Sequence, residues 1–203
     1  MTSPQTAIPK KNDVPFYILI STILSQRTRD EVTYARAKAL FSGLKIRTAK
    51  DLAKRDIQEI EFVIRPVGFY KTKARRIKEV ARLILEKYDN RVPDSVEELL
   101  KLPGVGRKTA NCVLVYGFKR PAIPVDTHVH RVSNRLGLVK TNNPKETEIK
   151  LIQLIPKNKW ILLNEAMVRH GKLLCRPVGP RCEECFLGDY CDYKLQRQNQ
   201  PKK

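Results

Sequence analysis

A glycine-rich turn followed by basic residues stands near the middle of the chain. The second of two expected short helices opens with Arg107 and Lys108, directly after the turn Leu102-Pro103-Gly104-Val105-Gly106. Glycines let a backbone turn tightly and approach a phosphate closely, and the N–H groups and dipole at a helix start favour an anion. We therefore interpret this turn, together with Arg107, as a phosphate-binding element. An ordinary helix–helix connection is the alternative.

Four of the five cysteines gather near the end of the sequence. Cys175, Cys182, Cys185 and Cys191 are separated by six, two and five residues. Thiolates crowded in this way predict a metal site. Zinc is the metal most commonly bound by four cysteines. Structural zinc sites, however, usually show two short Cys pairs, and only one occurs here. Cys112, the fifth cysteine, lies in an expected helix and is predicted to be a small buried residue.

A carboxylate and two histidines precede or begin another expected helix, in the segment Pro124-Val125-Asp126-Thr127-His128-Val129-His130-Arg131. Most aspartates in this position are helix N-caps, and Asp126 is well placed to be one. Residues two apart on a helix point in different directions. His128 and His130 are therefore expected to pack or to face a ligand such as DNA, rather than to share a metal.

The chain carries a strong positive charge. Its 203 residues include 40 Lys and Arg against 21 Asp and Glu, a formal net charge of +19. This charge favours a polyanion, and nucleic acid in particular, as the partner. A membrane is not expected, because no run of about 18 apolar residues occurs. The N-terminal segment lacks the apolar stretch of a secretory signal, which predicts a cytoplasmic or chromosome-associated protein with reduced thiols.

The hydrophobic pattern predicts an all-α protein. The apolar run FYILISTIL after Pro15 is typical of a buried helix, and apolar residues spaced by three and four recur along most of the chain. Further helices are expected over residues 31–43, 48–54, 56–65, 72–88, 95–101, 107–118, 127–137, 144–154 and 158–172. Residues 1–14 and the closing QRQNQPKK are expected to be poorly ordered or solvated. No segment alternates convincingly as a strand would.

The segments LPGVGRKTA and PVDTHVHR and the six-two-five cysteine spacing together resemble the endonuclease III family of helix-hairpin-helix iron–sulfur DNA glycosylases. The resemblance runs from about Pro15 to Tyr193. It implies the helix-hairpin-helix glycosylase fold with two helical lobes. Residues 15–120 would form a six-helix lobe, and residues 1–14 with 121–203 would form a lobe that carries a [4Fe-4S] cluster loop at 175–191. The damaged nucleotide would enter between the lobes.

The resemblance also assigns roles. Lys108 corresponds to the family's nucleophile, an amine that displaces the damaged base and forms a Schiff base with the sugar. Asp126 corresponds to the family's catalytic carboxylate, which stabilises positive charge on the sugar and accepts a proton. Cys175, Cys182, Cys185 and Cys191 would hold the [4Fe-4S] cluster. Its expected role is to brace a basic loop near phosphates, and electron transfer is the alternative.

Family members open the duplex with a polar side chain after an early helix and apolar residues on a later loop. Ser25-Gln26-Arg27-Thr28 resembles the first element and Val67-Gly68-Phe69-Tyr70 the second. The family commonly has Gln where this chain has Arg27, while Gln26 lies one residue earlier. The inserted side chain is thus Gln26 or Arg27 from the first element, with Val67 and Phe69 expected to contact DNA from the second.

The resemblance implies a bifunctional DNA glycosylase with AP lyase activity, which excises oxidised pyrimidines from duplex DNA during base excision repair. Its partner would be double-stranded DNA containing damaged bases or abasic sites, and a monomer is the default expectation. Two alternatives remain. A monofunctional mismatch glycosylase generally lacks the hairpin lysine, and the adenine-removing enzymes have a Glu where this chain has Thr22. A non-catalytic helix-hairpin-helix DNA-binding module needs neither Lys108 and Asp126 nor the cysteines.

Overall fold

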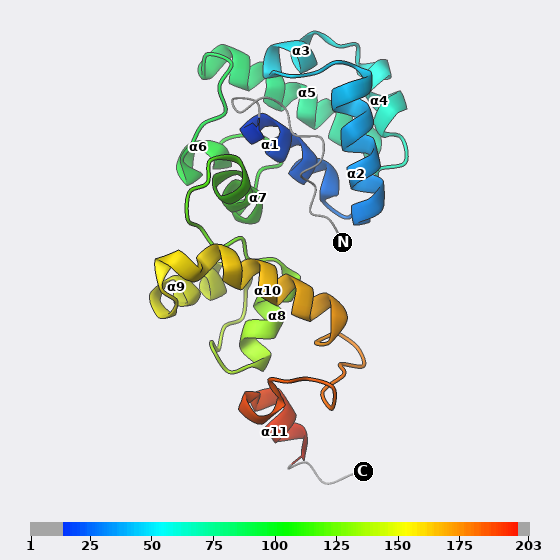
Figure 1. Ribbon diagram of the computed structural model, residues 1–203. Helices are drawn as coiled ribbons and strands as arrows, with labels where there is room; N and C mark the ends of the chain where they lie inside the picture. The colour runs from blue at the N-terminus through cyan, green and yellow to red at the C-terminus, as the bar shows by residue number, and fades with distance from the viewer. Residues whose placement is uncertain (1–13, 199–203) are drawn as a thin grey trace. The chain divides into compact units, whose positions relative to one another are not determined.

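The structure of the protein is a computed structural model that describes residues 14–198 (Figure 1). The predicted all-α fold is confirmed, because every regular element in this range is helical. Predictions made for residues 1–13 and 199–203 lie outside the described part of the chain. None of the helices between residues 14 and 198 combines the length and the apolar character that crossing a lipid bilayer requires.

The chain divides into two compact units between Arg120 and Pro121, and each is described by itself. In the first unit the α-helices are α1 (Val14–Ser25), α2 (Asp30–Lys38), α3 (Ala49–Lys54), α4 (Ile57–Ile64), α5 (Tyr70–Lys87), α6 (Val96–Leu100) and α7 (Arg107–Cys112). In the second they are α8 (Thr127–Arg135), α9 (Pro144–Leu154), α10 (Trp160–Leu173) and α11 (Asp192–Gln198). Val14, which the sequence analysis grouped with the second lobe, begins α1 of the first unit.

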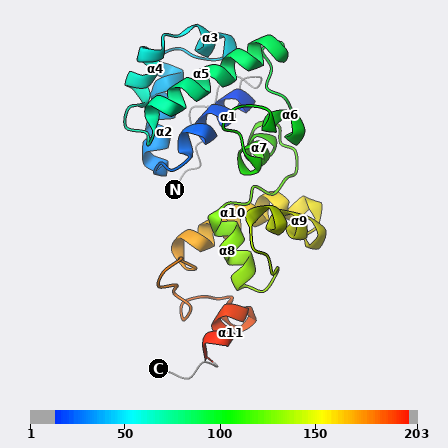
Figure 2. The ribbon, with the colours of Figure 1, turned by 180° about the vertical axis from the view of Figure 1, so that it is seen from behind.

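Helix α1 forms the centre of the first unit. It is apolar on almost every side, and Leu19, Ile20, Ile23 and Leu24 are fully buried. It packs against α2, α5 and α7 (Figure 2). Full burial of one such side chain stabilises a fold by about 1.5–3 kcal/mol, so this helix carries a large share of the core. Its C-terminal end therefore gives a fixed base to the turn that follows.

Helix α5 closes the other side of this core with an amphipathic stripe. Ala74, Ile77, Val80, Ala81 and Ile84 are fully buried on one face, while the opposite face carries charged side chains. This is the three-and-four spacing that the sequence predicts for residues 72–88. α5 packs against α1, α3 and α4, and so connects the central helix with the outer ones.

Short polar side chains set the starts of the outer helices. The Thr48 hydroxyl accepts the Asp51 N–H while an Asp51 carboxylate oxygen accepts the Thr48 N–H, a reciprocal cap for α3. Ser95 caps α6 by accepting from Glu98 N–H at 3.3 Å. Caps of this kind are each worth about 1 kcal/mol. They fix the first residues of α3 and α6.

Two helices end in a wider π-helical turn that periodicity did not predict. Ala39–Gly43 follows α2, and Val113–Gly117 follows α7. At Gly117 a Cβ would stand 2.9 Å from Pro15 Cα, which leaves no room for a side chain. The absence of a side chain thus lets the end of the α7 segment approach the start of α1 closely. The hairpin helix is in this way attached to the central helix.

The second unit has a smaller core between α8, α9 and α10. Its buried side chains are Ile123, Val125, Val129, Val132, Val139, Leu151 and Met167. Asn164 on α10 donates to the carbonyl of Pro124 at 2.6 Å, and this buried hydrogen bond holds the segment before α8 in place. The helix α11 was not predicted from the sequence: residues 196–198, which were expected to be solvated tail, lie at its end.

Candidate active site

The glycine-rich turn lies between α6 and α7, as the sequence predicts. Gly104 has a φ of +76°, a left-handed conformation that glycine adopts without steric cost. The Val105 N–H donates to Leu102 O at 3.1 Å, so it closes the turn on itself. Gly106 is the N-cap of α7 and has no side chain that could cap the helix. The start of α7, and not the Val105 N–H, is thus the part of this segment that suits an anion.

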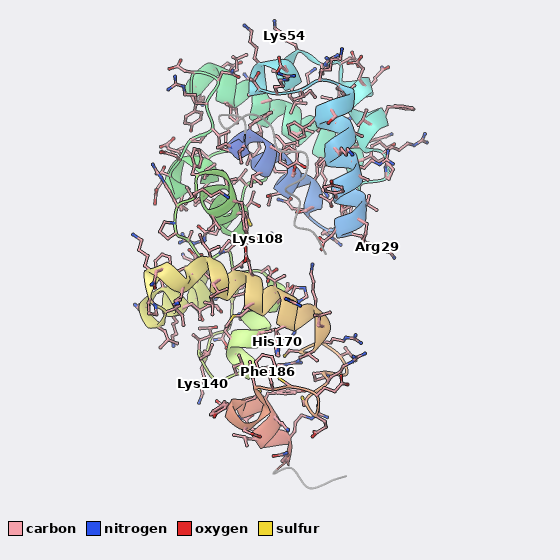
Figure 3. The ribbon with its side chains drawn as sticks, viewed as in Figure 1. Arg29, Lys54, Lys108, Lys140, His170 and Phe186 are labelled. Atoms are coloured by element: carbon pink, nitrogen blue, oxygen red, sulfur yellow. The ribbon has the colours of Figure 1, made fainter. Side chains whose placement is uncertain are left out.

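Lys108 occupies the first turn of α7 with its side chain exposed (Figure 3). The residues that follow it, Thr109, Ala110, Asn111 and Cys112, are buried. Cys112 therefore has the buried position that the sequence analysis expects. An exposed amine on a helix whose other face is packed in the core is held in place yet accessible to a ligand. That combination suits a nucleophile on a rigid support.

Gln26 is tied to the hairpin. Its side-chain amide donates to Gly104 O at 2.9 Å and to the Thr109 hydroxyl at 3.5 Å, and it is half-buried. To reach a DNA base it would have to give up these hydrogen bonds. Its neighbour Arg27 is exposed. The geometry therefore favours Arg27 over Gln26 as the side chain that extends from the protein to reach DNA.

Arg27 and Phe69 lie together on adjacent turns. The Arg27 guanidinium carbon stands 5.0 Å from the centre of the Phe69 ring, within the range of a cation–π contact. Both residues have left-handed backbone, with φ values of 54° and 59°. Phe69 is 61% exposed although it is a large aromatic residue. An exposed aromatic side chain beside a cation is a suitable pair for stacking on nucleobases.

Val67 does not share this exposure. Its side chain is 2% exposed and belongs to the core, so it offers DNA no exposed side-chain surface, and the expected contact of Val67 with DNA stays a prediction. The reason is that Val67 ends the turn that follows α4 and faces inward, whereas Phe69 precedes α5 and faces outward. Of the two apolar residues in this loop, Phe69 alone offers an exposed side chain.

A buried lysine lies behind these two turns, and the sequence analysis missed it. Lys73 is 3% exposed, and its ammonium group donates to Leu24 O at 2.8 Å, to Thr28 Oγ1 at 3.0 Å and to Gln26 O. Burial, and then the positive charge of Arg76, lower the pKa of Lys73 to about 8. The sequence did indicate this burial, because Lys73 lies on the same helical face as the apolar stripe of α5.

Asp126 is the N-cap of α8. Its Oδ1 accepts from the N–H groups of His128 and Val129, both at 2.9 Å. Its other oxygen, Oδ2, has no hydrogen-bond partner among residues 14–198. The cap orients the carboxylate, and a second oxygen is left for other chemistry. The N-cap interpretation of Asp126 therefore leaves room for a catalytic one.

The two histidines of α8 take part in packing. A Cβ at Gly171 of α10 would stand 2.9 Å from His128 Nδ1, so His128 lies closely against that helix. Its Nδ1 is also 3.2 Å from an Arg131 guanidinium nitrogen. His130 Nδ1 is 2.7 Å from the Thr147 hydroxyl of α9. The two side chains thus point to different helices, as their spacing predicts.

The four clustered cysteines line one cavity in the second unit. Leu136, Leu174 and Gly188 also line it, together with the side chains of Arg135 and His170. None of the four is in a disulfide. Among residues 14–198, no group of three or more His, Cys, Asp or Glu side chains is arranged to hold a single metal ion. The observation that bears on a cluster site is therefore that the four thiols line the same cavity.

Two arginines of α8 fasten the cysteine loop. Arg131 donates to Cys175 O at 2.9 and 3.0 Å, and Arg135 donates to Arg176 O at 2.7 Å and to Pro177 O at 3.1 Å. Arg135 also approaches Cys175 Sγ at 3.6 Å. The backbone of the cysteine loop is thus held against α8, and a guanidinium lies beside one of the four sulfur atoms.

His170 borders the same cavity. Its Nε2 is 3.7 Å from Cys185 Sγ, and its ring meets the edge of Phe186 with 6.0 Å between ring centres (Figure 3). Burial lowers the pKa of His170 below its usual value. A neutral imidazole is therefore favoured beside the cysteine loop.

The structure brings some of the predicted residues together and leaves others apart. The hairpin with Lys108, Gln26, Arg27 and Phe69 belongs to the first unit. Asp126 and the four cysteines belong to the second. Each group thus has a defined local geometry on its own set of helices.

Comparison with known proteins agrees with this fold. Residues 20–157 match the HhH-GPD superfamily of base excision DNA repair proteins. The endonuclease III of Thermotoga maritima is 54% identical over 187 residues, which cover 92% of this chain and 87% of the relative. The endonuclease III of Bacillus subtilis is 37% identical, over 87% of this chain and 80% of the relative.

Solved structures give the same result. A trapped endonuclease III–DNA covalent intermediate has a TM-score of 0.84 and 39% identity, covering 92% of this chain and 87% of that one. A thermostable thymine-DNA glycosylase has a TM-score of 0.81 and 29% identity, covering 91% and 86%. The chain therefore belongs to the HhH-GPD superfamily of base excision DNA repair proteins and, within it, to the endonuclease III family.

Proposed function

We propose that the protein is a bifunctional DNA glycosylase and AP lyase that acts on oxidised pyrimidines in duplex DNA. The observation that carries the proposal is the exposed Lys108 in the first turn of α7, directly after the glycine-rich turn. A relative solved as a covalent intermediate with DNA supports the same chemistry. The net charge of +19 supplies the general attraction for the phosphate backbone.

In the proposed reaction the unprotonated Lys108 amine attacks C1′ of the damaged nucleotide. The C–N bond to Lys108 forms as the glycosidic bond breaks, and the base leaves with the bonding electron pair and takes up a proton. The sugar ring opens to a Schiff base on Lys108. Loss of a proton from C2′ then expels the 3′ phosphate by β-elimination, and water hydrolyses the Schiff base to release the lysine.

Asp126 is proposed to assist the first step. Its free carboxylate oxygen would stabilise positive charge that develops on the sugar and accept the proton that the attacking amine loses. The helix N-terminal N–H groups that bind Oδ1 hold the carboxylate in one orientation. The proposal therefore gives the two oxygens of Asp126 different tasks.

Arg27 and Phe69 are proposed to fill the space that the damaged base leaves in the duplex. Base excision requires the target nucleotide to leave the stack, at a cost of a few kcal/mol. The exposed Phe69 ring can replace lost stacking, and the Arg27 guanidinium beside it can hydrogen-bond to the orphaned base. The hairpin backbone and Arg107 would hold the neighbouring phosphates.

The four cysteines are proposed to hold a [4Fe-4S] cluster. They fit that group, because four thiols without disulfides share one cavity, and Arg135 of α8 lines the same cavity. When bound, the cluster would cross-link residues 175–191 into a rigid loop. The exposed Arg176 and Arg181 on this loop would then contact phosphates.

Loss of one ligand tests the cluster. We expect Cys185→Ala to lose most of its iron, its sulfide and its visible absorbance, because one of the four proposed thiolate bonds that hold the cluster is removed. Cys112→Ala, which removes a buried thiol in the first unit, should keep all three. Purification without oxygen, followed by iron and sulfide analysis, measures this. Equal iron content in Cys185→Ala and the wild type would contradict the ligand assignment.

Borohydride trapping tests the proposed function as a whole. The wild-type protein is incubated with a duplex containing one oxidised pyrimidine, and the imine is reduced to a stable covalent complex. We expect such a complex, together with strand cleavage on the 3′ side of the lesion. Alkali-labile sites without any covalent complex would instead support a monofunctional glycosylase. The structural similarity to a thymine-DNA glycosylase favours this alternative.

A further inference from the structure

We propose that Lys73 is a positioning residue that holds the Arg27 turn and the Phe69 turn in register, so that the pair can enter the DNA stack. The inference rests on the proposed function, because it concerns how that function opens the duplex. It assigns to Lys73 no contact with DNA. Lys73 would act through the backbone and side chain of residues 24–28.

The ammonium group of Lys73 has a defined position. It lies beneath the end of α1, where it donates to Leu24 O, to Gln26 O and to the Thr28 hydroxyl. The last carbonyls of a helix lack partners within the helix, and a cation near them is favoured. An ammonium group has three N–H donors, and these three acceptors use all of them.

Lys73 is also linked to the Phe69 turn. The Thr28 hydroxyl that binds Lys73 also accepts the Gly68 N–H at 3.2 Å. The Lys73 backbone N–H donates to Phe69 O at 3.0 Å, so Lys73 lies in the first turn of α5, one turn after the N-cap Phe69. One residue thus contacts the Arg27 turn through its side chain and the Phe69 turn through its backbone.

The two turns have an unfavourable backbone conformation. Arg27 and Phe69 both have φ values near +55°, which cost a non-glycine residue about 1–2 kcal/mol each. Such conformations persist when the surroundings determine them. The hydrogen bonds around Lys73 supply that determination on both sides, since they fix the residues immediately before and after Arg27 and the residue before Phe69.

The burial of the Lys73 ammonium group has an energetic cost. A buried cation is expensive unless its hydrogen bonds are satisfied, and the three acceptors of Lys73 are uncharged. An apolar residue would suit the stripe of Ala74 and Ile77 without this cost. The lysine therefore fixes the backbone geometry of the two turns, in addition to packing in the core.

A matched control lies on the same helix. Lys78 of α5 is half-buried, and its ammonium group donates to Arg55 O at the end of α3. It thus performs the same helix-end interaction as Lys73, but away from Arg27 and Phe69. Lys78→Met should lower stability through a lost cap without disturbing the two turns.

The experiment compares two substrates for Lys73→Met, Lys78→Met and the wild type. One is a duplex with an oxidised pyrimidine, which must be opened. The other is a single strand with a preformed abasic site, which offers Lys108 a sugar without any duplex to open. We expect Lys73→Met to lose duplex excision by up to about 100-fold, the cost of a misplacement of about 1 Å. Its cleavage of the single strand should stay within about threefold of the wild type.

Fluorescence gives a second readout that does not depend on turnover. With 2-aminopurine opposite the lesion, unstacking of the orphaned base raises the signal on binding. Lys73→Met is expected to reduce this rise and Lys78→Met to preserve it. If Lys73→Met fails to fold, Thr28→Val removes the bridging hydroxyl with little change of shape and should show the same split between substrates.

The outcomes separate the two proposals. Equal losses on both substrates, or the same behaviour in Lys73→Met and Lys78→Met, would overturn the positioning role and leave a general stabilising one. A wild-type protein inactive on both substrates would overturn the proposed function, and this inference with it. Normal wild-type activity with an unchanged Lys73→Met overturns the inference alone.

Discussion

Lys108→Gln is expected to abolish the covalent complex with DNA. Glutamine keeps the length and polarity of the side chain but has no nucleophilic amine, so neither base displacement nor Schiff base formation can proceed. Loss of an enzyme's nucleophile costs roughly 10³–10⁶-fold in rate, which places the residual strand cleavage below detection in a short assay. Because Lys108 is exposed, the substitution should change the free energy of unfolding by no more than about 0.5 kcal/mol.

The measurement is borohydride trapping on a denaturing gel, with thermal unfolding and duplex affinity recorded for the same preparations. Lys101→Gln is the matched control, since Lys101 is an exposed lysine on the other side of the same turn. It should retain the covalent complex. A complex of undiminished yield in Lys108→Gln would show that another amine is the nucleophile.

Asp126→Asn is expected to separate chemistry from capping. Asparagine caps helices about as well as aspartate, so α8 should keep its start and the unfolding free energy should change little. The negative charge is lost, and excision of an oxidised pyrimidine should fall roughly 10²–10⁴-fold, the usual contribution of a general acid or base. Strand cleavage at a preformed abasic site should fall less, because no base has to leave.

Asp126→Ala completes the comparison. It removes both cap and charge, and should show the same loss of excision together with a loss of about 1 kcal/mol of stability. Single-turnover excision and chemical unfolding measure the two effects independently. Excision within about threefold of wild type in Asp126→Asn would show that Asp126 serves only as the N-cap of α8.

The arrangement of helices was largely predictable from the sequence. Apolar spacing located α1 through α10 because each helix must bury one face, and a buried face leaves a periodic pattern. The π-helical turns after α2 and α7 were not predictable in this way. They depend on where a chain segment meets another helix, as Gly117 meets Pro15.

The candidate site was predictable where a residue type carries the chemistry. Lys108, Asp126 and the four cysteines were named from the motifs, and their roles stay predictions until tested. Exposure was less predictable: Val67 and Phe69 are two residues apart and both apolar, yet the first is buried and the second exposed. The partners of Gln26 and Lys73 lie at a distance in the chain, so no local pattern indicates them.

The contact between the two turns also limits how this protein can be redesigned. A Cβ at Gly68 would stand 2.8 Å from Arg27 O, a backbone atom that cannot swing aside. A combinatorial library aimed at altered base preference can therefore randomise positions 27 and 69 while position 68 is kept as glycine. Any side chain there would push the two turns apart, and selection would discard those clones regardless of what positions 27 and 69 encode.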